Sequence, residues 1–185
     1  MQSNRCSGFT LIELMVAITV VAIFLALAVP AFTSTINRSR LSAATNELVT
    51  SLQYARSEAI KRNARVDLCR SADQVQCGSG TDSWPGWIVV VPDGNGDGAS
   101  NDPKVLQSFQ LEPPIQLHSA VDGGRIGYRP DGFARAGGTA RGAFLNTFFD
   151  LCIATNAPAE NRRRVRVVSG ERLATDPMNG AGTCQ

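Results

Sequence analysis

The sequence predicts an α+β protein in which one long N-terminal helix packs on a small antiparallel β-sheet or sandwich domain. Residues 9–29 form an apolar run with one charge, and apolar residues then recur at steps of three and four as far as Arg62. From residue 64 to residue 185 short apolar runs alternate with Gly, Pro, Asn and Asp clusters, which is typical of antiparallel strands. A chain of 185 residues is long enough for one such domain with an attached helix.

The apolar run from residue 9 to residue 29 is predicted to span a membrane. As a helix it would be roughly 32 Å long at about 1.5 Å per residue, which matches the hydrocarbon core of a bilayer. A secretory signal peptide cleaved after Ala28 is the alternative interpretation. Two features favour a retained helix. The run exceeds the roughly 7 to 15 apolar residues of a signal peptide, and Glu13 would cost about 2.5 to 3.5 kcal/mol at the bilayer centre, a cost that indicates a function.

Residues 30–63 are predicted to continue the helix as an amphipathic segment. Its apolar face consists of Leu41, Ala44, Leu48, Leu52, Ala55 and Ala59. Pro30 removes one backbone hydrogen bond, so we expect a kink between the two halves.

The β domain is predicted to contain six strands, which we place near Arg65–Arg70, Gly86–Val91, Lys104–Leu111, Gly124–Arg129, Gly142–Ala154 and Arg162–Ser169. Trp84 and Trp87 flank the start of the second strand. We interpret both as core or hairpin packing rather than as a ligand platform.

The N-terminus resembles the class III signal of type IV pilins and type II secretion pseudopilins: a short polar leader ending in Gly8, then Phe9-Thr10-Leu11-Ile12-Glu13 and a long apolar helix. The resemblance implies that prepilin peptidase removes residues 1–8 by cutting between Gly8 and Phe9, and that Phe9 is then N-methylated. It also implies a partner for Glu13, the α-amino group of Phe9 on a neighbouring subunit. Such a pair compensates a carboxylate that would otherwise be buried alone.

The chain as a whole resembles the FimT/FimU/GspH group of minor pilins and pseudopilins, through "LQYARSEAIKRNARVDLCRS", "WPGWIVVVPDGNGDG" and "GYRPDGFARAGG". The resemblance implies a pilin-like fold and a minor pilin that helps to initiate or cap a type IV pilus. A GspH-type minor pseudopilin of a type II secretion system is the alternative. Other pilins or pseudopilins would be partners through the N-terminal helix. The implied location is the bacterial inner membrane, with a single pass and the β domain in the periplasm, and later the pilus or pseudopilus.

Four cysteines remain if the leader containing Cys6 is removed. An even number in an exported chain favours two disulfides. We predict Cys69–Cys77, which are eight residues apart, and Cys152–Cys184, which would hold the C-terminal tail on the sheet. Two other pairings and free thiols are the alternatives. The absence of a CxxC pair argues against a zinc site.

The segment Arg162–Ser169 is the most basic strand of a chain whose formal net charge is only +2. Alternation along a strand places Arg162, Arg164 and Arg166 on one face, where they would form a phosphate-binding row. A solvated edge strand is the alternative. FimT-type proteins that bind DNA carry a C-terminal Gly-Arg-x-Arg motif, whereas this chain has Gly-Glu-Arg-Leu at 170–173. This departure counts against DNA binding. A DNA-binding tip subunit that uses the arginine row is a further functional alternative, with Arg172 as its fourth candidate residue.

Two other candidate sites carry less weight. In "PDGNGDGASNDP", Asp93, Asn95, Asp97 and Gly98 match positions of a calcium loop, but Lys104 stands where a bidentate Glu is needed. Turn chemistry alone explains the composition of residues 93–102. His118 is the single histidine and has no catalytic partner that the sequence identifies, and there is no Walker A or dinucleotide motif. We therefore expect neither an enzyme nor a bound metal or cofactor.

Overall fold

The computed structural model describes residues 9–80, 83–92, 103–136 and 143–184, with the side chains at 27 and 29–31 left aside. Helix α1 (Leu11–Arg62) begins at Thr10, whose side chain accepts a hydrogen bond from the Glu13 N–H at 3.3 Å. It ends at Asn63, which adopts the left-handed conformation that commonly closes a helix. The predicted helix end near Arg62 is confirmed.

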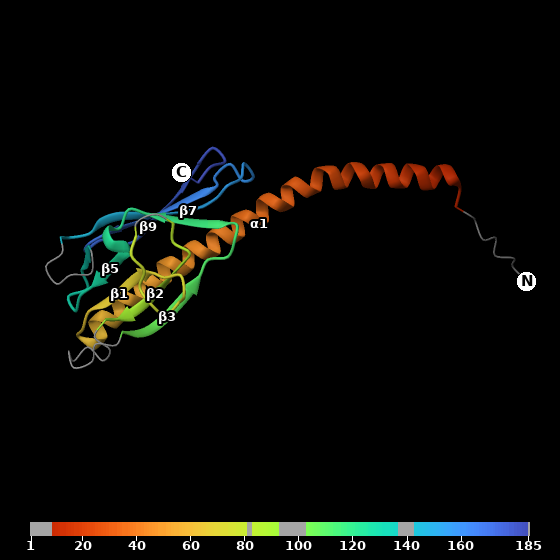
Figure 1. Ribbon diagram of the computed structural model, residues 1–185. Helices are drawn as coiled ribbons and strands as arrows, with labels where there is room; N and C mark the ends of the chain where they lie inside the picture. The colour runs from red at the N-terminus through yellow and green to blue at the C-terminus, as the bar shows by residue number, and fades with distance from the viewer. Residues whose placement is uncertain (1–8, 81–82, 93–102, 137–142, 185) are drawn as a thin grey trace, which may run out of the picture.

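The N-terminal half of α1 projects away from the β domain, and the axis of the helix bends between the projecting half and the packed half (Figure 1). The helix is continuous through position 30. The contribution of Pro30 to this bend stays a prediction, because its side chain lies outside the described residues.

Nine strands among the described residues form two antiparallel sheets. The first sheet has the order β3-β2-β1-β5-β6 and the second has the order β4-β7-β8-β9. Their bounds are β1 Val66–Arg70, β2 Gly86–Val91, β3 Lys104–Gln110, β4 Ile115–Ser119, β5 Arg125–Tyr128, β6 Ala134–Ala136, β7 Asn146–Ile153, β8 Arg162–Val168 and β9 Ala174–Met178. A short 3-10 turn, Asp122–Gly124, precedes β5.

The six predicted strands are present as β1, β2, β3, β5, β7 and β8, although β7 starts four residues later than predicted, at Asn146. Strands β4, β6 and β9 were not predicted from the sequence. Strand β6 has only three residues, and β9 contains Pro177, which cannot donate to a sheet. The proline is accommodated because β9 is an edge strand that pairs only with β8.

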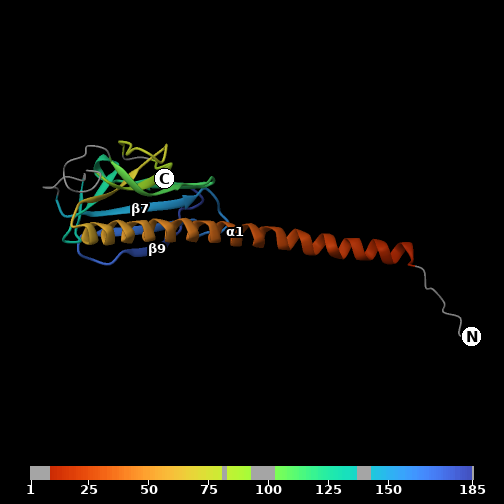
Figure 2. The same cartoon turned by 90° about the horizontal axis from the view of Figure 1, so that it is seen from below.

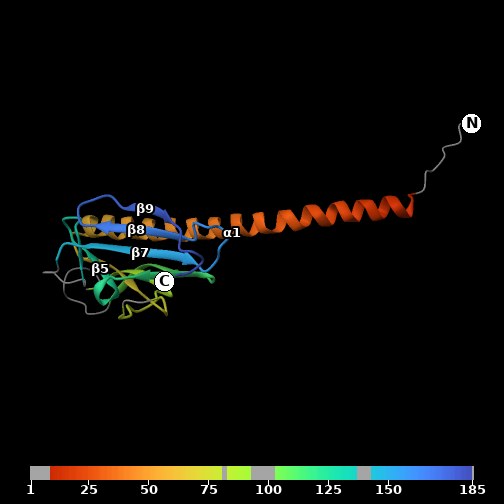
Figure 3. The same cartoon turned by 90° about the horizontal axis from the view of Figure 1, so that it is seen from above.

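The packed half of α1 lies along the β domain, and β9, β8 and β7 run side by side next to it (Figures 2 and 3). The predicted apolar face of the helix is confirmed, because all six of its residues are at most 4% exposed and belong to one core with residues of both sheets. Trp84 and Trp87 are also in this core, as predicted. Trp84 meets Phe149 edge to face, and Trp87 stacks on Phe109.

Both predicted disulfides are present. Cys69–Cys77 ties the end of β1 to the loop that follows it, next to a second, smaller cluster with Ile88 and Val90. Cys152–Cys184 joins β7 to the C-terminal tail across 32 residues. In the chain-entropy model a loop of that length is worth about 3 to 4 kcal/mol.

A buried hydrogen bond joins the helix to the first sheet. The indole N–H of Trp87 donates to the hydroxyl of Ser51 at 2.9 Å, and both residues are completely buried. Replacing Ser51 by Ala should lower the free energy of unfolding by about 1 to 3 kcal/mol, because the indole N–H would be left without a partner. Urea denaturation measures this. Ser57→Ala, on the exposed face of the same helix, should change stability by less than about 0.5 kcal/mol, and equal effects would contradict the assignment.

Candidate functional site

The projecting half of α1 is apolar on all sides. Its exposed large side chains are Phe9, Leu11, Ile12, Leu14, Met15, Val16, Ile18, Val20, Val21, Ile23, Phe24 and Leu25. A helix that is hydrophobic all round requires an apolar environment, and an exposed apolar surface of this extent marks an interaction site. No β-domain residue covers it, within the part of the chain that the structure describes.

Glu13 lies in the first turn of α1, where the helix dipole favours a negative charge. Its backbone N–H is satisfied by the Thr10 side chain, and its carboxylate is exposed together with the apolar residues around it. Phe9 is exposed four residues earlier. Gly8 and the rest of the predicted leader lie outside the described residues, so the cleavage there stays a prediction.

Among the described residues, no helix offers a stretch that is long and apolar enough to cross a membrane.

The predicted arginine row forms on one face of β8. Val165 and Val167 point into the core from the other face. The alternative of an edge strand is wrong, because β8 lies between β7 and β9 and pairs with both.

Two carboxylates neutralise much of the charge of the arginine row. Arg164 donates two parallel hydrogen bonds to Asp150, each of 2.7 Å, and its guanidinium lies over the ring of Phe148. The hydrogen bond to Asp150 raises the pKa of Arg164. Arg162 approaches the same carboxylate at 3.8 Å, and Arg166 pairs with Asp176 at 3.1 Å.

Neither carboxylate was predicted from the sequence as a partner of the arginine row. Asp150 lies within a predicted strand, so it could have been found from the register that places it opposite Arg164. Asp176 lies in β9, which was not predicted.

Arg172 does not join the row. It follows β8 and lines a cavity together with Val167, a residue of the core-facing side of the strand. The four predicted DNA-binding residues are therefore divided between two surfaces.

His118 lies on β4, one residue before the strand ends, with a ring nitrogen 3.4 Å from the Gln116 side-chain oxygen. No cluster of three or more His, Cys, Asp or Glu side chains that could hold a metal occurs among the described residues. The candidate calcium loop, residues 93–102, lies outside them.

The fold and the bare apolar helix together define a pilin-like subunit, and comparisons with known proteins agree. Residues 3–29 match the prokaryotic N-terminal methylation motif, and residues 44–170 match the family described as type II transport protein GspH. The chain belongs to this GspH family, whose members are minor pilins and pseudopilins of the GspH/FimU type.

Two crystal forms of the type IV minor pilin FimU from Pseudomonas aeruginosa have a similar structure, each at 18% sequence identity. One gives a TM-score of 0.52, with 76% of this chain and 90% of FimU covered. The other gives 0.49, with 74% and 92% covered. At this level of sequence identity, the similarity to FimU shows a shared fold and nothing further. No curated protein sequence matches the chain.

The ion pairs of the arginine row predict that Asp150 and Asp176 contribute differently to the free energy of unfolding. Asp150 is 8% exposed, and Asp150→Asn should lower the free energy of unfolding by about 1.5 to 3 kcal/mol, because charge-assisted hydrogen bonds to Arg164 are lost. Asp176→Asn removes an exposed pair and should cost less than about 1 kcal/mol. Urea denaturation of both variants measures the difference, and a larger loss for Asp176→Asn would contradict this ranking.

Proposed function

We propose that this protein is a minor pilin of the FimT/FimU type, which helps to initiate or cap the assembly of a type IV pilus. The observation that carries the proposal is the long, exposed, apolar half of α1 with a single carboxylate in its first turn. A β domain of the GspH family at the other end of the helix supports it.

The proposed pathway rests on the N-terminal methylation motif and on the apolar surface of the helix. Prepilin peptidase removes residues 1–8, and Phe9 becomes the methylated N-terminus. The apolar half of α1 anchors the subunit in the inner membrane, with the β domain in the periplasm. During assembly the same surface passes from lipid to the apolar core of a filament, so it is covered at every stage.

Glu13 is the residue that sets the register in this proposal. A carboxylate inside lipid or a filament core is costly unless it is paired. The α-amino group of Phe9 on a neighbouring subunit would supply the opposite charge. Because one amine meets one carboxylate, the pair fixes the axial position of each helix relative to the next.

A minor pseudopilin of a type II secretion system is the alternative, and the family name supports it. Both assemblies would use the same helix in the same way. The two disulfides and the arginine-bearing strand favour the pilus, because both suit a domain displayed outside the cell.

Replacing Glu13 by Gln should abolish incorporation of the subunit into filaments while leaving processing intact. The variant keeps the shape of the side chain but cannot pair with an amine. Immunodetection in the sheared pilus fraction measures incorporation, and the mass of the N-terminal peptide measures processing. Glu112→Gln, an exposed carboxylate of the β domain, is the matched control and should be incorporated normally.

Three results would change the proposal. Wild-type incorporation of the Glu13→Gln variant would contradict the pairing. Cleavage after Ala28 would remove the helix and the filament role with it. Recovery with the secretion machinery and not with pili would favour the pseudopilin.

DNA binding at the pilus tip is the second candidate, favoured by the arginine row on the outer face of β8. The three guanidiniums contact two carboxylates, so the charge left for phosphates is small.

If the row binds DNA, retention of the protein on DNA should fall steeply as the salt concentration rises. Replacing Arg162, Arg164 and Arg166 by Gln should then reduce the slope of log affinity against log salt by up to about 3. Asp176→Asn should strengthen retention. Salt-insensitive or absent retention of the full chain would end this candidate.

A further inference from the structure

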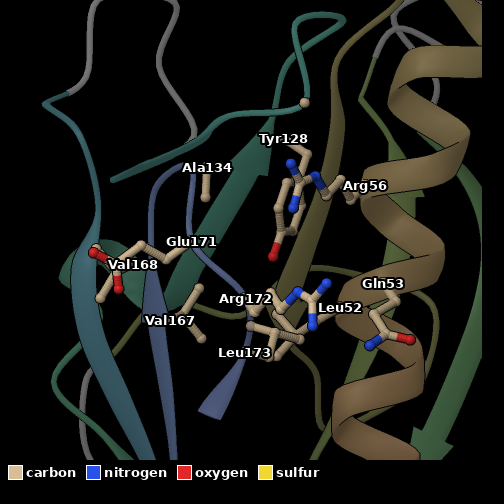
Figure 4. A pocket seen from close by; sticks show the side chains of 12 residues that line it. Leu52, Gln53, Arg56, Tyr128, Ala134, Val167, Val168, Glu171, Arg172 and Leu173 are labelled. Carbon is tan, nitrogen blue, oxygen red and sulfur yellow. The ribbon is translucent and has the colours of Figure 1, made fainter.

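A cavity of about 370 Å³ lies between α1 and the strands that pack beside it (Figure 4). Its lining comes from segments that are far apart in the sequence. Leu52 and Arg56 come from α1, Tyr128 ends β5, Val167 belongs to β8, and Arg172 lies between β8 and β9. None of the three arginines of the row lines this cavity, so it is a separate site.

Two guanidinium groups border this cavity without a carboxylate partner. Across the described residues, neither Arg56 nor Arg172 forms an ion pair. Glu171 also borders the cavity, but Figure 4 shows its carboxylate directed away from both guanidiniums. Two positive charges are therefore available to a ligand, which favours an anion.

Tyr128 adds a hydrogen-bond donor. The residue is only 4% exposed, and within the described part of the chain its hydroxyl has no hydrogen-bond partner. Burial raises the pKa of Tyr128, with Arg56 opposing the change, so the hydroxyl keeps its proton at neutral pH. This hydroxyl can therefore donate a hydrogen bond to an acceptor group inside the cavity.

Gly132, which has a φ of +76°, has no side chain and so leaves space for the Arg56 side chain beside the cavity. A Cβ there would lie 3.4 Å from Nε of Arg56 and 3.2 Å from Ile60. Leu52, Ala134 and Val167 form an apolar part of the wall, and Gln53 adds a polar side chain. A ligand that fits therefore has one anionic end and a small apolar body.

We propose that this cavity binds a small carboxylate- or phosphate-bearing molecule, whose anionic group contacts Arg56, Arg172 and the hydroxyl of Tyr128 while its apolar part rests on Leu52 and Val167. The inference does not depend on filament assembly, because every residue that it uses belongs to the folded β domain and the packed half of α1.

Calorimetric titration of the purified full chain with benzoate, phenyl phosphate and inorganic phosphate tests the proposal. We expect phenyl phosphate to bind more tightly than inorganic phosphate, since only the former fills the apolar part. Comparison of benzoate with phenyl phosphate distinguishes a carboxylate site from a phosphate site. Arg172→Gln and Arg56→Gln should each weaken binding roughly tenfold, and Tyr128→Phe should weaken it roughly three- to tenfold.

The matched control is Arg40→Gln, which removes another exposed arginine of α1 and should leave binding unchanged. Arg172 is on an exposed turn, so its variant should fold even if a helix variant does not, and thermal unfolding without ligand checks this. Three results would overturn the proposal: no binding of any of the three probes to the wild-type chain, unchanged binding by the Arg172→Gln variant, or an equal loss with Arg40→Gln, which would indicate unspecific charge attraction.

Discussion

The packing of one face of α1 against both sheets is the contact on which the rest of the structure depends. Three leucines and three alanines make up this face, from Leu41 to Ala59, so that large side chains fill the core while small ones let the helix approach the strands. The same contact positions Ser51 beside Trp87 and Arg56 beside the cavity. It also directs the opposite half of the helix away from the domain, which leaves that half available to other subunits.

The second sheet uses its arginines mainly to stabilise itself. The register of β7, β8 and β9 aligns Asp150, Arg164 and Asp176 across three neighbouring strands. Alternating charges in such a cross-strand row attract, whereas three arginines alone would repel. Pairing with carboxylates of the neighbouring strands therefore accounts for the arginine row without any ligand. This is why the assembly role rests on α1, whose exposed apolar surface has no comparable explanation within one subunit.

The features that local patterns determine were predictable from the sequence. The steps of three and four from Leu41 to Ala59 identified the buried helix face, and the spacing of Cys69 and Cys77 identified a disulfide. Features that depend on register or on distant segments were not predictable in this way. Asp150 meets Arg164 only when two strands align, β9 is obscured by Pro177, and the cavity unites segments separated by more than a hundred residues.

Buried carboxylates in the β domain and the packed helix are paired with arginines, and the same requirement bears on Glu13. Asp67 is fully buried between Arg65 and Arg125, and even so burial raises its pKa. Glu58 is bound by Arg62, whose hydrogen bond lowers the pKa of Glu58. Each of these carboxylates has an arginine from the same chain. Glu13 is exposed in the isolated subunit and has no ion-pair partner among the described residues. If the surface around it is buried on assembly, the same physical requirement applies, and the positive charge has to come from another molecule.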